Sequence, residues 1–346
     1  MKKKNKRRLI FLIAAAILFI AAIICWEYVR DNRLGNFESS VNLYVYPDMG
    51  PDEVIAEIEK SSVIRHKAAL KSVFREKQVA TYIKPGYYRI TPSTSSVALA
   101  RMLNNGWQSP VNLVLSGSIR LKEDLARKIS NQLMLSKEDV LGALNDRALL
   151  AEYGFTPETV FALFIPDTYS CYWTTSMKEI FDIQKKAWDA FWTPEKIRSA
   201  EKQGLDKIQV SILASIVQGE SHYEPEQPLI AGVYLNRLDK NMLLQADPTV
   251  AFCFDYSINR VLNKHLRFDS PYNTYLYPGL PPGPICVPSK ACLKAVLNPD
   301  RKDGYLYFCA NPDFSGTHVF AKDFSQHAVN AHKFQQELTR RQKAKN

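Results

Sequence analysis

The sequence predicts an α+β fold in three parts: an N-terminal transmembrane helix, a small α+β module and a larger α+β domain. Three observations predict this organisation. Residues 9–26 contain no charged side chain, a pattern of strand, turn and helix occurs three times between residues 41 and 133, and helical segments mixed with short strand-like ones follow to the C-terminus. Because 46% of the 346 residues are apolar and 11% are aromatic, the chain can form packed cores.

The first expected element is a membrane anchor. Its eighteen uncharged residues, 9–26, are just long enough to cross the hydrocarbon core of a bilayer as a helix. Six basic residues precede it, so the positive-inside rule places the N-terminus in the cytoplasm and the rest of the chain outside. A cleaved signal peptide and lipidation at Cys25 are the alternatives, but the bulky Ile23, Ile24 and Trp26 do not suit a cleavage site.

The boundaries follow from these patterns. We expect a basic cytoplasmic arm at 1–8, the anchor at 9–29, a polar linker at 30–40, the small module at 41–135 and the larger domain at 136–346. The net charge is +10, and the arm supplies six of these charges, leaving +4 for the remainder. Because most of the excess lies in one short arm, the sequence argues against a nucleic-acid partner.

The cysteines and histidines do not indicate a metal site. Five cysteines follow the anchor: Cys171, Cys253, Cys286, Cys292 and Cys309. In an oxidising compartment an odd number implies at least one free thiol and allows one or two disulfides, and buried small hydrophobic residues are the alternative. No Cys-x-x-Cys pair occurs, and the six histidines lack zinc-like spacing. We therefore expect no metal.

The small module contains three strand–turn–helix units. The expected strands are 41–46, 86–90 and 111–115, and the expected helices are 53–61, 96–105 and 121–133. Gly106 suits the end of the second helix. Residues 88–103 resemble the LysM carbohydrate-binding module, although a connecting α+β domain without sugar binding explains the same pattern.

The candidate catalytic residue is Glu220. Ile208, Ile212 and Ile216 recur every four residues on one helix face, and Glu220 continues that series at the C-terminal end. Burial and the negative end of the helix dipole would both raise the pKa of this carboxyl, as a general acid near neutral pH requires. The alternative is a glutamate that turns to solvent as the helix frays after Gly219.

Polar and aromatic residues downstream could form a sugar-binding groove. Asp247 precedes Pro248, so a helix N-cap followed by proline at the first helical position would also explain this pair. A loop rich in proline and glycine carries Tyr272, Asn273 and Tyr275, which suit a sugar site or a packed loop equally well. Residues 305–308 and 316–320 are expected to form two strands.

These motifs together resemble the YceG-like family of endolytic murein transglycosylases. The resemblance covers Ile216-Val217-x-x-Glu220, Asn236-Arg237-Leu238, Leu244-Gln245-x-Asp247-Pro248-Thr249, Tyr272-Asn273-Thr274-Tyr275, residues 279–285, 305–308 and 316–320, with 164–169 at the entry to the catalytic domain. It implies Glu220 as the catalytic glutamate and a bacterial inner-membrane protein with a periplasmic catalytic domain. Gln218 departs from the acidic residue expected there in many relatives.

The resemblance also implies a reaction. A lytic transglycosylase cleaves the MurNAc–GlcNAc β-1,4 bond of nascent peptidoglycan strands and leaves 1,6-anhydro-MurNAc ends, which would terminate glycan polymerisation beside penicillin-binding proteins. It calls for no metal or organic cofactor. The residues expected to position the sugars are Gln245, Asp247, Thr249, Tyr272, Asn273, Tyr275 and His318.

Two other functions stay open at this stage. A lysozyme-type hydrolase needs a second carboxylate near Glu220, for which Asp247 and Glu224 are candidates. A non-catalytic peptidoglycan-binding scaffold of the cell-wall synthesis complex needs neither. The products distinguish them, because the hydrolase leaves reducing ends, the transglycosylase leaves anhydro ends and the scaffold releases nothing.

Overall fold

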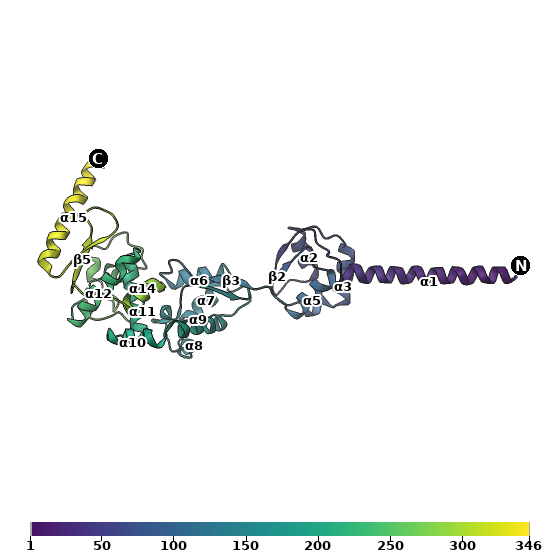
Figure 1. The fold of residues 1–346 in the computed structure, drawn as a ribbon, viewed down its shortest axis with the longest axis horizontal. Helices are drawn as coiled ribbons and strands as arrows, with labels where there is room; N and C mark the ends of the chain where they lie inside the picture. The colour runs from purple at the N-terminus through teal and green to yellow at the C-terminus, as the bar shows by residue number, and fades with distance from the viewer. Residues whose placement is uncertain (1, 346) are drawn as a thin grey trace. The chain divides into compact units, whose positions relative to one another are not determined.

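The computed structural model describes residues 2–345, which separate into two compact units (Figure 1). The first unit contains the chain up to Asn112 together with Ser170–Thr174. The second contains Leu113–Tyr169 and the chain from Thr175 onward. Helices and small two-stranded sheets occur in this chain, in agreement with the expected α+β class.

The N-terminal helix is longer than the uncharged run that predicted it. Helix α1 extends over Lys2–Asn32, and its segment Lys4–Asn32 is long and apolar enough to cross a membrane. The apolar side chains of this segment are exposed in the protein, as those of a lipid-facing helix are. The helix is compatible with a single-pass anchor, and it continues three residues into the expected linker.

The first unit is built on one antiparallel strand pair. Strand β1 (Val41–Val45) pairs with β2 (Gly86–Ile90), with Leu43 opposite Tyr88. Alternate residues of β1 are buried, as the period-two pattern predicts. The helices are α2 (Pro51–Glu59), α3 (Lys67–Glu76), α4 (Val79–Tyr82) and α5 (Ser96–Asn105). The expected end of α5 is confirmed, because Gly106 is left-handed with φ +66°.

The third strand–turn–helix unit lies apart from the other two. Strand β3 (Val111–Val114) pairs with β4 (Thr168–Cys171) and not with β1 or β2. Helix α6 (Lys122–Ser130) packs on α7 (Lys137–Asn145) in the second compact unit. The three units therefore do not form one sheet, and the structure groups 113–135 with the larger domain. The likeness of 88–103 to LysM stays a prediction.

The second unit is mainly helical. Its further elements are α8 (Arg147–Ala151), η1 (Val160–Leu163), α9 (Met177–Phe191), α10 (Pro194–Lys202), α11 (Lys207–Glu220), η2 (Glu224–Glu226), α12 (Gln227–Asp239), α13 (Asp247–Phe252), η3 (His265–Arg267), α14 (Lys290–Leu297), β5 (Tyr307–Ala310), β6 (His318–Ala321) and α15 (Phe324–Lys345). Ser176 and Thr193 cap α9 and α10 with their side chains. The two expected C-terminal strands form the antiparallel hairpin β5–β6.

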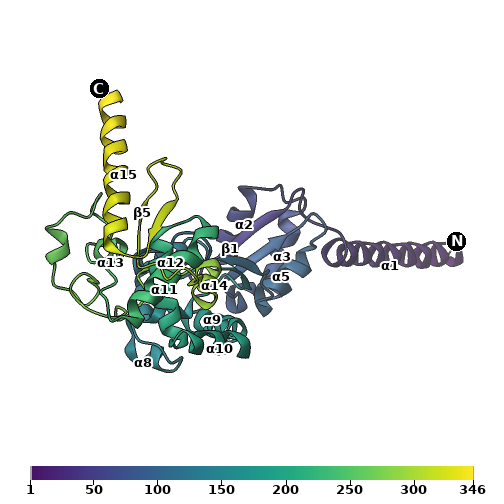
Figure 2. The same ribbon diagram turned by 60° about the vertical axis from the view of Figure 1, so that its left-hand side comes forward.

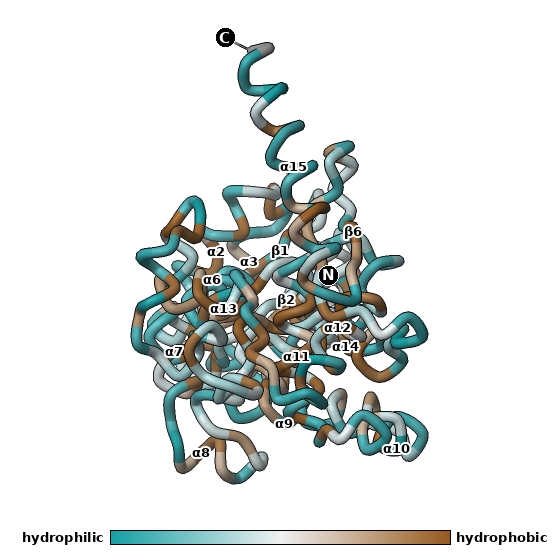
Figure 3. Tube along the Cα trace, turned by 90° about the vertical axis from the view of Figure 1, so that its left-hand side faces the viewer, coloured by the Kyte–Doolittle hydropathy of each residue, from teal (hydrophilic) through white to brown (hydrophobic). Residues whose placement is uncertain are grey.

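Three helices that pack on one another form the core of the second unit. Helix α11 packs against both α12 and α14, and these two also contact each other (Figure 2). Residues 210–217 of α11 are all buried, so this helix lies at the centre of the unit. The largely hydrophilic α15 contacts β5 and β6 at the edge of the unit (Figure 3). The central position of α11 fixes the place of its last residue, Glu220.

Candidate active site

Glu220 ends the buried helix α11 and keeps part of its surface exposed. Helix α11 begins after Asp206, whose side chain accepts a hydrogen bond from the Gln209 amide. The helix then continues without interruption to Glu220. The predicted position of this carboxylate, at the C-terminal end of a buried helix, is therefore confirmed.

The surroundings of Glu220 favour its protonated form. Burial, and to a smaller extent the negative charge of Asp247, raises the pKa of Glu220, whose net value is about 7. Two groups act in the other direction on this pKa: the Tyr234 hydroxyl, which donates a hydrogen bond of 2.5 Å to Oε1, and the positive charge of Arg237. A carboxyl with this pKa can both donate and accept a proton near neutral pH.

Tyr234 and Arg237 lie three residues apart on α12, so both reach the same side of that helix. Tyr234 is buried, and burial raises the pKa of its hydroxyl well above the ordinary value, which keeps it a hydrogen-bond donor. Arg237 donates to the main-chain oxygens of Leu243, Leu244 and Leu306. Its guanidinium therefore holds two chain segments together next to the carboxylate.

Two cavities meet at Glu220 and Asp247, which line both. The first has a volume of about 340 Å³ and is also lined by Tyr234, Arg237, Leu244, Gln245, Tyr275, Tyr307, Phe308, Cys309, Ala310, His318, Phe324 and His327. The second has a volume of about 260 Å³ and is also lined by Ser118, Arg120, Gln218, Gly219, His222, Pro248, Ala251, Tyr256, Ile258, Asn259, Arg260, Val261 and Cys286. The carboxylate thus has space for a ligand on two sides.

Asp247 is not the N-cap that its sequence context indicated. Ala246 precedes the first residue of α13, which is Asp247 itself, and no side chain caps this helix. The Asp247 carboxylate instead accepts a hydrogen bond of 2.6 Å from the Tyr275 hydroxyl. The cap interpretation was wrong because a tertiary partner on the proline-rich loop orients this side chain outward from its own helix.

Gly219 explains how Asp247 comes close to Glu220. A Cβ atom added at Gly219 would lie 2.6 Å from Cβ and 2.9 Å from Cγ of Pro248. Only glycine therefore lets the N-terminal end of α13 approach the C-terminal end of α11 at this distance. The pair Gly219 and Pro248 brings the two carboxylates to the junction of the two cavities.

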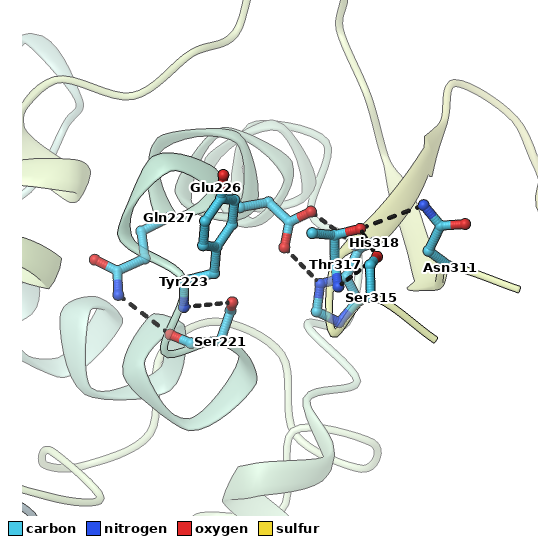
Figure 4. Close-up of polar contacts among 8 residues, drawn as sticks. All are labelled: Ser221, Tyr223, Glu226, Gln227, Asn311, Ser315, Thr317 and His318. Carbon is cyan, nitrogen blue, oxygen red and sulfur yellow. Dashed lines mark hydrogen bonds and ion pairs between the residues drawn. The ribbon is translucent and has the colours of Figure 1, made fainter. Parts of the chain in front are cut away.

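His318 lines the first cavity and is fixed by Glu226, which ends η2 (Figure 4). Oε1 of Glu226 accepts a hydrogen bond of 2.7 Å from the His318 main-chain amide, and Oε2 lies 2.8 Å from Nδ1 of the ring. Because Nδ1 is bound to the carboxylate, the other ring nitrogen, Nε2, is available to a ligand. Sequence reasoning named His318 and missed Glu226.

Comparisons with known proteins identify the family of this chain. The chain matches the YceG-like family over residues 43–333. It belongs to that family. It is 27% identical over 306 residues to an endolytic murein transglycosylase of Bacillus subtilis, covering 84% of this chain and 83% of the relative. It is 25% identical to an endolytic murein transglycosylase of Streptococcus pneumoniae, covering 87% of this chain and 60% of the relative.

A solved structure agrees with the assignment. The crystal structure of a YceG-like protein of Listeria monocytogenes aligns with a TM-score of 0.56 and 26% identity, covering 84% of this chain and 98% of that one. The family predicted from the ordered motifs of the sequence is therefore confirmed. The relatives' name, endolytic murein transglycosylase, is that of a lyase.

Within this YceG-like protein, four of the predicted sugar-positioning residues line the first cavity: Gln245, Asp247, Tyr275 and His318. Gln245 is exposed and left-handed at φ +51°, a conformation that costs a non-glycine residue energy. The main-chain N–H of Gln245 donates a hydrogen bond to the main-chain oxygen of Thr274. The strained backbone directs this side chain along the cavity wall.

The other three predicted residues lie outside both cavity linings. Thr249 is fully buried and donates to the Ala246 oxygen. Asn273 is also fully buried, and its amide donates to the oxygens of Leu266 and Phe268. The Tyr272 ring packs against the Phe252 ring in a tilted arrangement, with 4.8 Å between the ring centroids. These contacts hold the loop that carries Tyr275, so a role for the three residues in direct sugar contact stays a prediction without support from the geometry.

Sequence reasoning missed Tyr234, Arg237 and Glu226 as site residues. Arg237 was quoted as part of a motif, and the i,i+3 spacing to Tyr234 was the one available signal. Among residues 2–345, no cluster of three or more histidine, cysteine or acidic side chains could hold a metal ion. Cys286 and Cys292 are buried thiols, and burial raises the pKa of Cys292 to about 11.

Proposed function

We propose that this protein is an endolytic peptidoglycan lytic transglycosylase with Glu220 as its catalytic residue. One observation carries the proposal: a carboxyl whose pKa is raised to about 7 lies where two open cavities meet. An enzyme that cuts inside a polymer must accommodate sugar units on both sides of the scissile bond. The two cavities supply that space, and the family relatives carry the name of this activity.

In the proposed reaction, Glu220 acts twice. The protonated carboxyl first donates its proton to the oxygen of the MurNAc–GlcNAc β-1,4 bond, and the GlcNAc hydroxyl leaves. The C6 hydroxyl of the same MurNAc then attacks C1, and the Glu220 carboxylate accepts its proton. The product ends in 1,6-anhydro-MurNAc, no water is consumed, and one carboxyl is sufficient. Tyr234 holds Oε1 in place during both steps.

The lysozyme-type hydrolase is the second candidate, because Asp247 lines both cavities beside Glu220. A hydrolase would use this exposed carboxylate as nucleophile or base. Glu224, the other carboxylate considered, lines neither of the two cavities that contain Glu220. The non-catalytic scaffold is less consistent with a carboxyl whose pKa is raised in an open groove.

The anchor suggests where the protein acts. With α1 in the bacterial inner membrane and the N-terminus in the cytoplasm, the catalytic domain would reach glycan strands as they leave the membrane. Cleavage of nascent strands there would terminate their growth, with penicillin-binding proteins as the partners that the sequence resemblance suggests.

The test is mass spectrometry of glycan strands digested by the full chain in detergent. We expect products with 1,6-anhydro-MurNAc ends, lighter by one water than hydrolytic products. Glu220→Gln keeps the size and the hydrogen-bond acceptor but cannot transfer a proton, so turnover should fall by roughly 10³–10⁴-fold. Products with reducing ends alone would identify a hydrolase, and near-wild-type turnover of folded Glu220→Gln would exclude Glu220 as the catalytic residue.

A further inference from the structure

We propose that the second cavity, called here the basic cavity, binds the carboxylate groups of the peptide stems of peptidoglycan. The inference rests on the proposed function and adds a substrate requirement to it: the strand is cut at a MurNAc that carries its stem. Glu220 and Asp247 lie at the junction of the two cavities, and the remaining charged or titratable side chains of the basic cavity are Arg120, Arg260 and His222.

The two arginines are exposed cations without an acidic partner. Neither Arg120 nor Arg260 forms an ion pair within the part of the chain that the structure describes, whereas many surface cations of this chain do. The nearby carboxylate of Asp124 pairs with Arg127 and accepts hydrogen bonds from the main-chain amides of Arg120 and Leu121, so it engages the backbone of Arg120 and not its guanidinium. Both guanidinium groups are therefore available to an anionic ligand.

Arg120 is also held in position. Its guanidinium lies over the Tyr256 ring, 5.0 Å from the ring centroid, and the Tyr256 hydroxyl donates a hydrogen bond of 2.7 Å to the Ile285 oxygen. A guanidinium that stacks on an aromatic face keeps its in-plane N–H donors free, and these match the two oxygens of a carboxylate. The stack therefore orients Arg120 before the ligand binds.

The chemical groups of peptidoglycan indicate which ligand the basic cavity binds. The sugars of a glycan strand carry hydroxyl and N-acetyl groups, and their anionic groups are the carboxylates of the stems attached to the MurNAc lactyl groups. The arginine of the first cavity, Arg237, already donates to three main-chain oxygens, so its guanidinium is less available to such anions than those of Arg120 and Arg260. A lipid pyrophosphate is also anionic, but a strand has it at one end only, whereas every MurNAc that enters an endolytic site can carry a stem.

The experiment measures kcat/KM of the full chain in detergent on two substrates: uncrosslinked strands that carry stems, and the same strands after an amidase has removed the stems. We expect a preference of roughly 10- to 100-fold for stem-bearing strands, since a hydrogen bond between charged groups contributes this much to binding. Replacing both arginines, Arg120→Gln with Arg260→Gln, should reduce the preference to near one and act through KM. Arg120→Lys keeps the positive charge and should retain part of the preference.

The control is Arg198→Gln, an exposed arginine of α10 that pairs with Glu195 outside both cavities, and it should keep the wild-type preference. A preference unchanged in the double variant would overturn the inference while leaving the proposed function intact. A double variant that keeps its preference for stems but loses a preference for lipid-linked over lipid-free strands would show that the basic cavity binds a pyrophosphate. This result would also overturn the inference. Failure of the wild-type chain to cut either substrate would instead defeat the proposed function.

Discussion

Burial is the main cause of the raised pKa of Glu220, and two neighbouring side chains shift this pKa in opposite directions. The Tyr234 hydroxyl stabilises the ionised carboxylate by a hydrogen bond and lowers the pKa, while the negative charge of Asp247 raises it. As a general acid, Glu220 must be protonated, so activity should fall as pH rises through its folded-state pKa of about 7. Each neighbour should therefore move this alkaline limb in its own direction.

A pair of conservative substitutions tests this balance. Tyr234→Phe removes the hydrogen bond to the carboxylate, so the alkaline limb of kcat/KM should move to higher pH. Asp247→Asn removes the negative charge, so the limb should move to lower pH. Because Asp247 does not cap α13, Asp247→Asn should leave the free energy of unfolding nearly unchanged. Turnover should fall by about 10²-fold if the charge of Asp247 stabilises the developing positive charge on the sugar.

The measurement is a pH profile of kcat/KM for the wild type and both variants, with an unfolding curve for each at neutral pH. Tyr277→Phe is the control, because its hydroxyl donates to Asp269 and the residue lines neither cavity. Limbs that shift in the same direction in Tyr234→Phe and Asp247→Asn would contradict the opposed roles. Unchanged turnover of the Asp247→Asn variant would show that the charge of Asp247 does not contribute to the reaction.

At the scale of elements, the sequence predicted what local rules determine. Gly106 ends its helix as its residue type requires. The strand 86–90 also lies where it was predicted, and the strand expected at 305–308 begins two residues later, at 307–310. Each of these features depends on residues a few positions apart, so one sequence is sufficient to predict them.

Features that depend on distant partners were missed or misassigned. The alternation in residues 111–115 predicted a strand, but nothing local distinguishes β4 from β1 as its partner. The hydrogen bond from Tyr275 to Asp247 joins residues 28 positions apart, and without it a cap was the simplest interpretation of Asp247-Pro248. Tyr234 has no local signature of a catalytic neighbour, because only the packing of α12 on α11 brings it to Glu220.

The contact between α11 and α13 gives a prediction at this scale. Gly219→Ala would place a Cβ atom 2.6 Å from the Pro248 ring, which cannot rotate away, so the start of α13 must shift. We expect a loss of about 1–3 kcal/mol in the free energy of unfolding, typical of overpacking. Turnover should fall further than stability explains, because the shift moves Asp247 relative to Glu220.

Gly142→Ala is the matched control. Gly142 lies within α7, and a Cβ atom added there meets nothing within 4 Å, so alanine should stabilise the protein by about 0.5–1 kcal/mol through helix propensity. Urea unfolding of both variants, with turnover measured on the same preparations, provides the comparison. Equal stability changes at the two glycines would show that the close approach of Pro248 to Gly219 is not required.

At the scale of the whole molecule, the chain combines a catalytic unit with an apolar N-terminal helix. Helix α1 ends at Asn32, and the following residues belong to the core of the first unit: Phe37 is fully buried, and the Asn36 side chain accepts a hydrogen bond from the His66 amide and donates to Ser96. A truncation must therefore keep residues from Leu34 onward to preserve this unit. Such a chain loses α1 and retains every residue of the candidate site.

The truncated chain separates membrane attachment from catalysis. We expect the full chain to fractionate with membranes and the chain starting at Leu34 to be soluble without detergent, because α1 supplies the long exposed apolar segment of the described residues. Both should cut purified strands in solution at similar rates. In membranes that polymerise glycan, the truncated chain should leave longer strands, since it no longer concentrates the site where strands emerge. Recovery of the native protein without residues 1–26 would show that the segment is cleaved. Equal strand lengths with both chains would show that attachment through α1 does not contribute to the termination of strand growth.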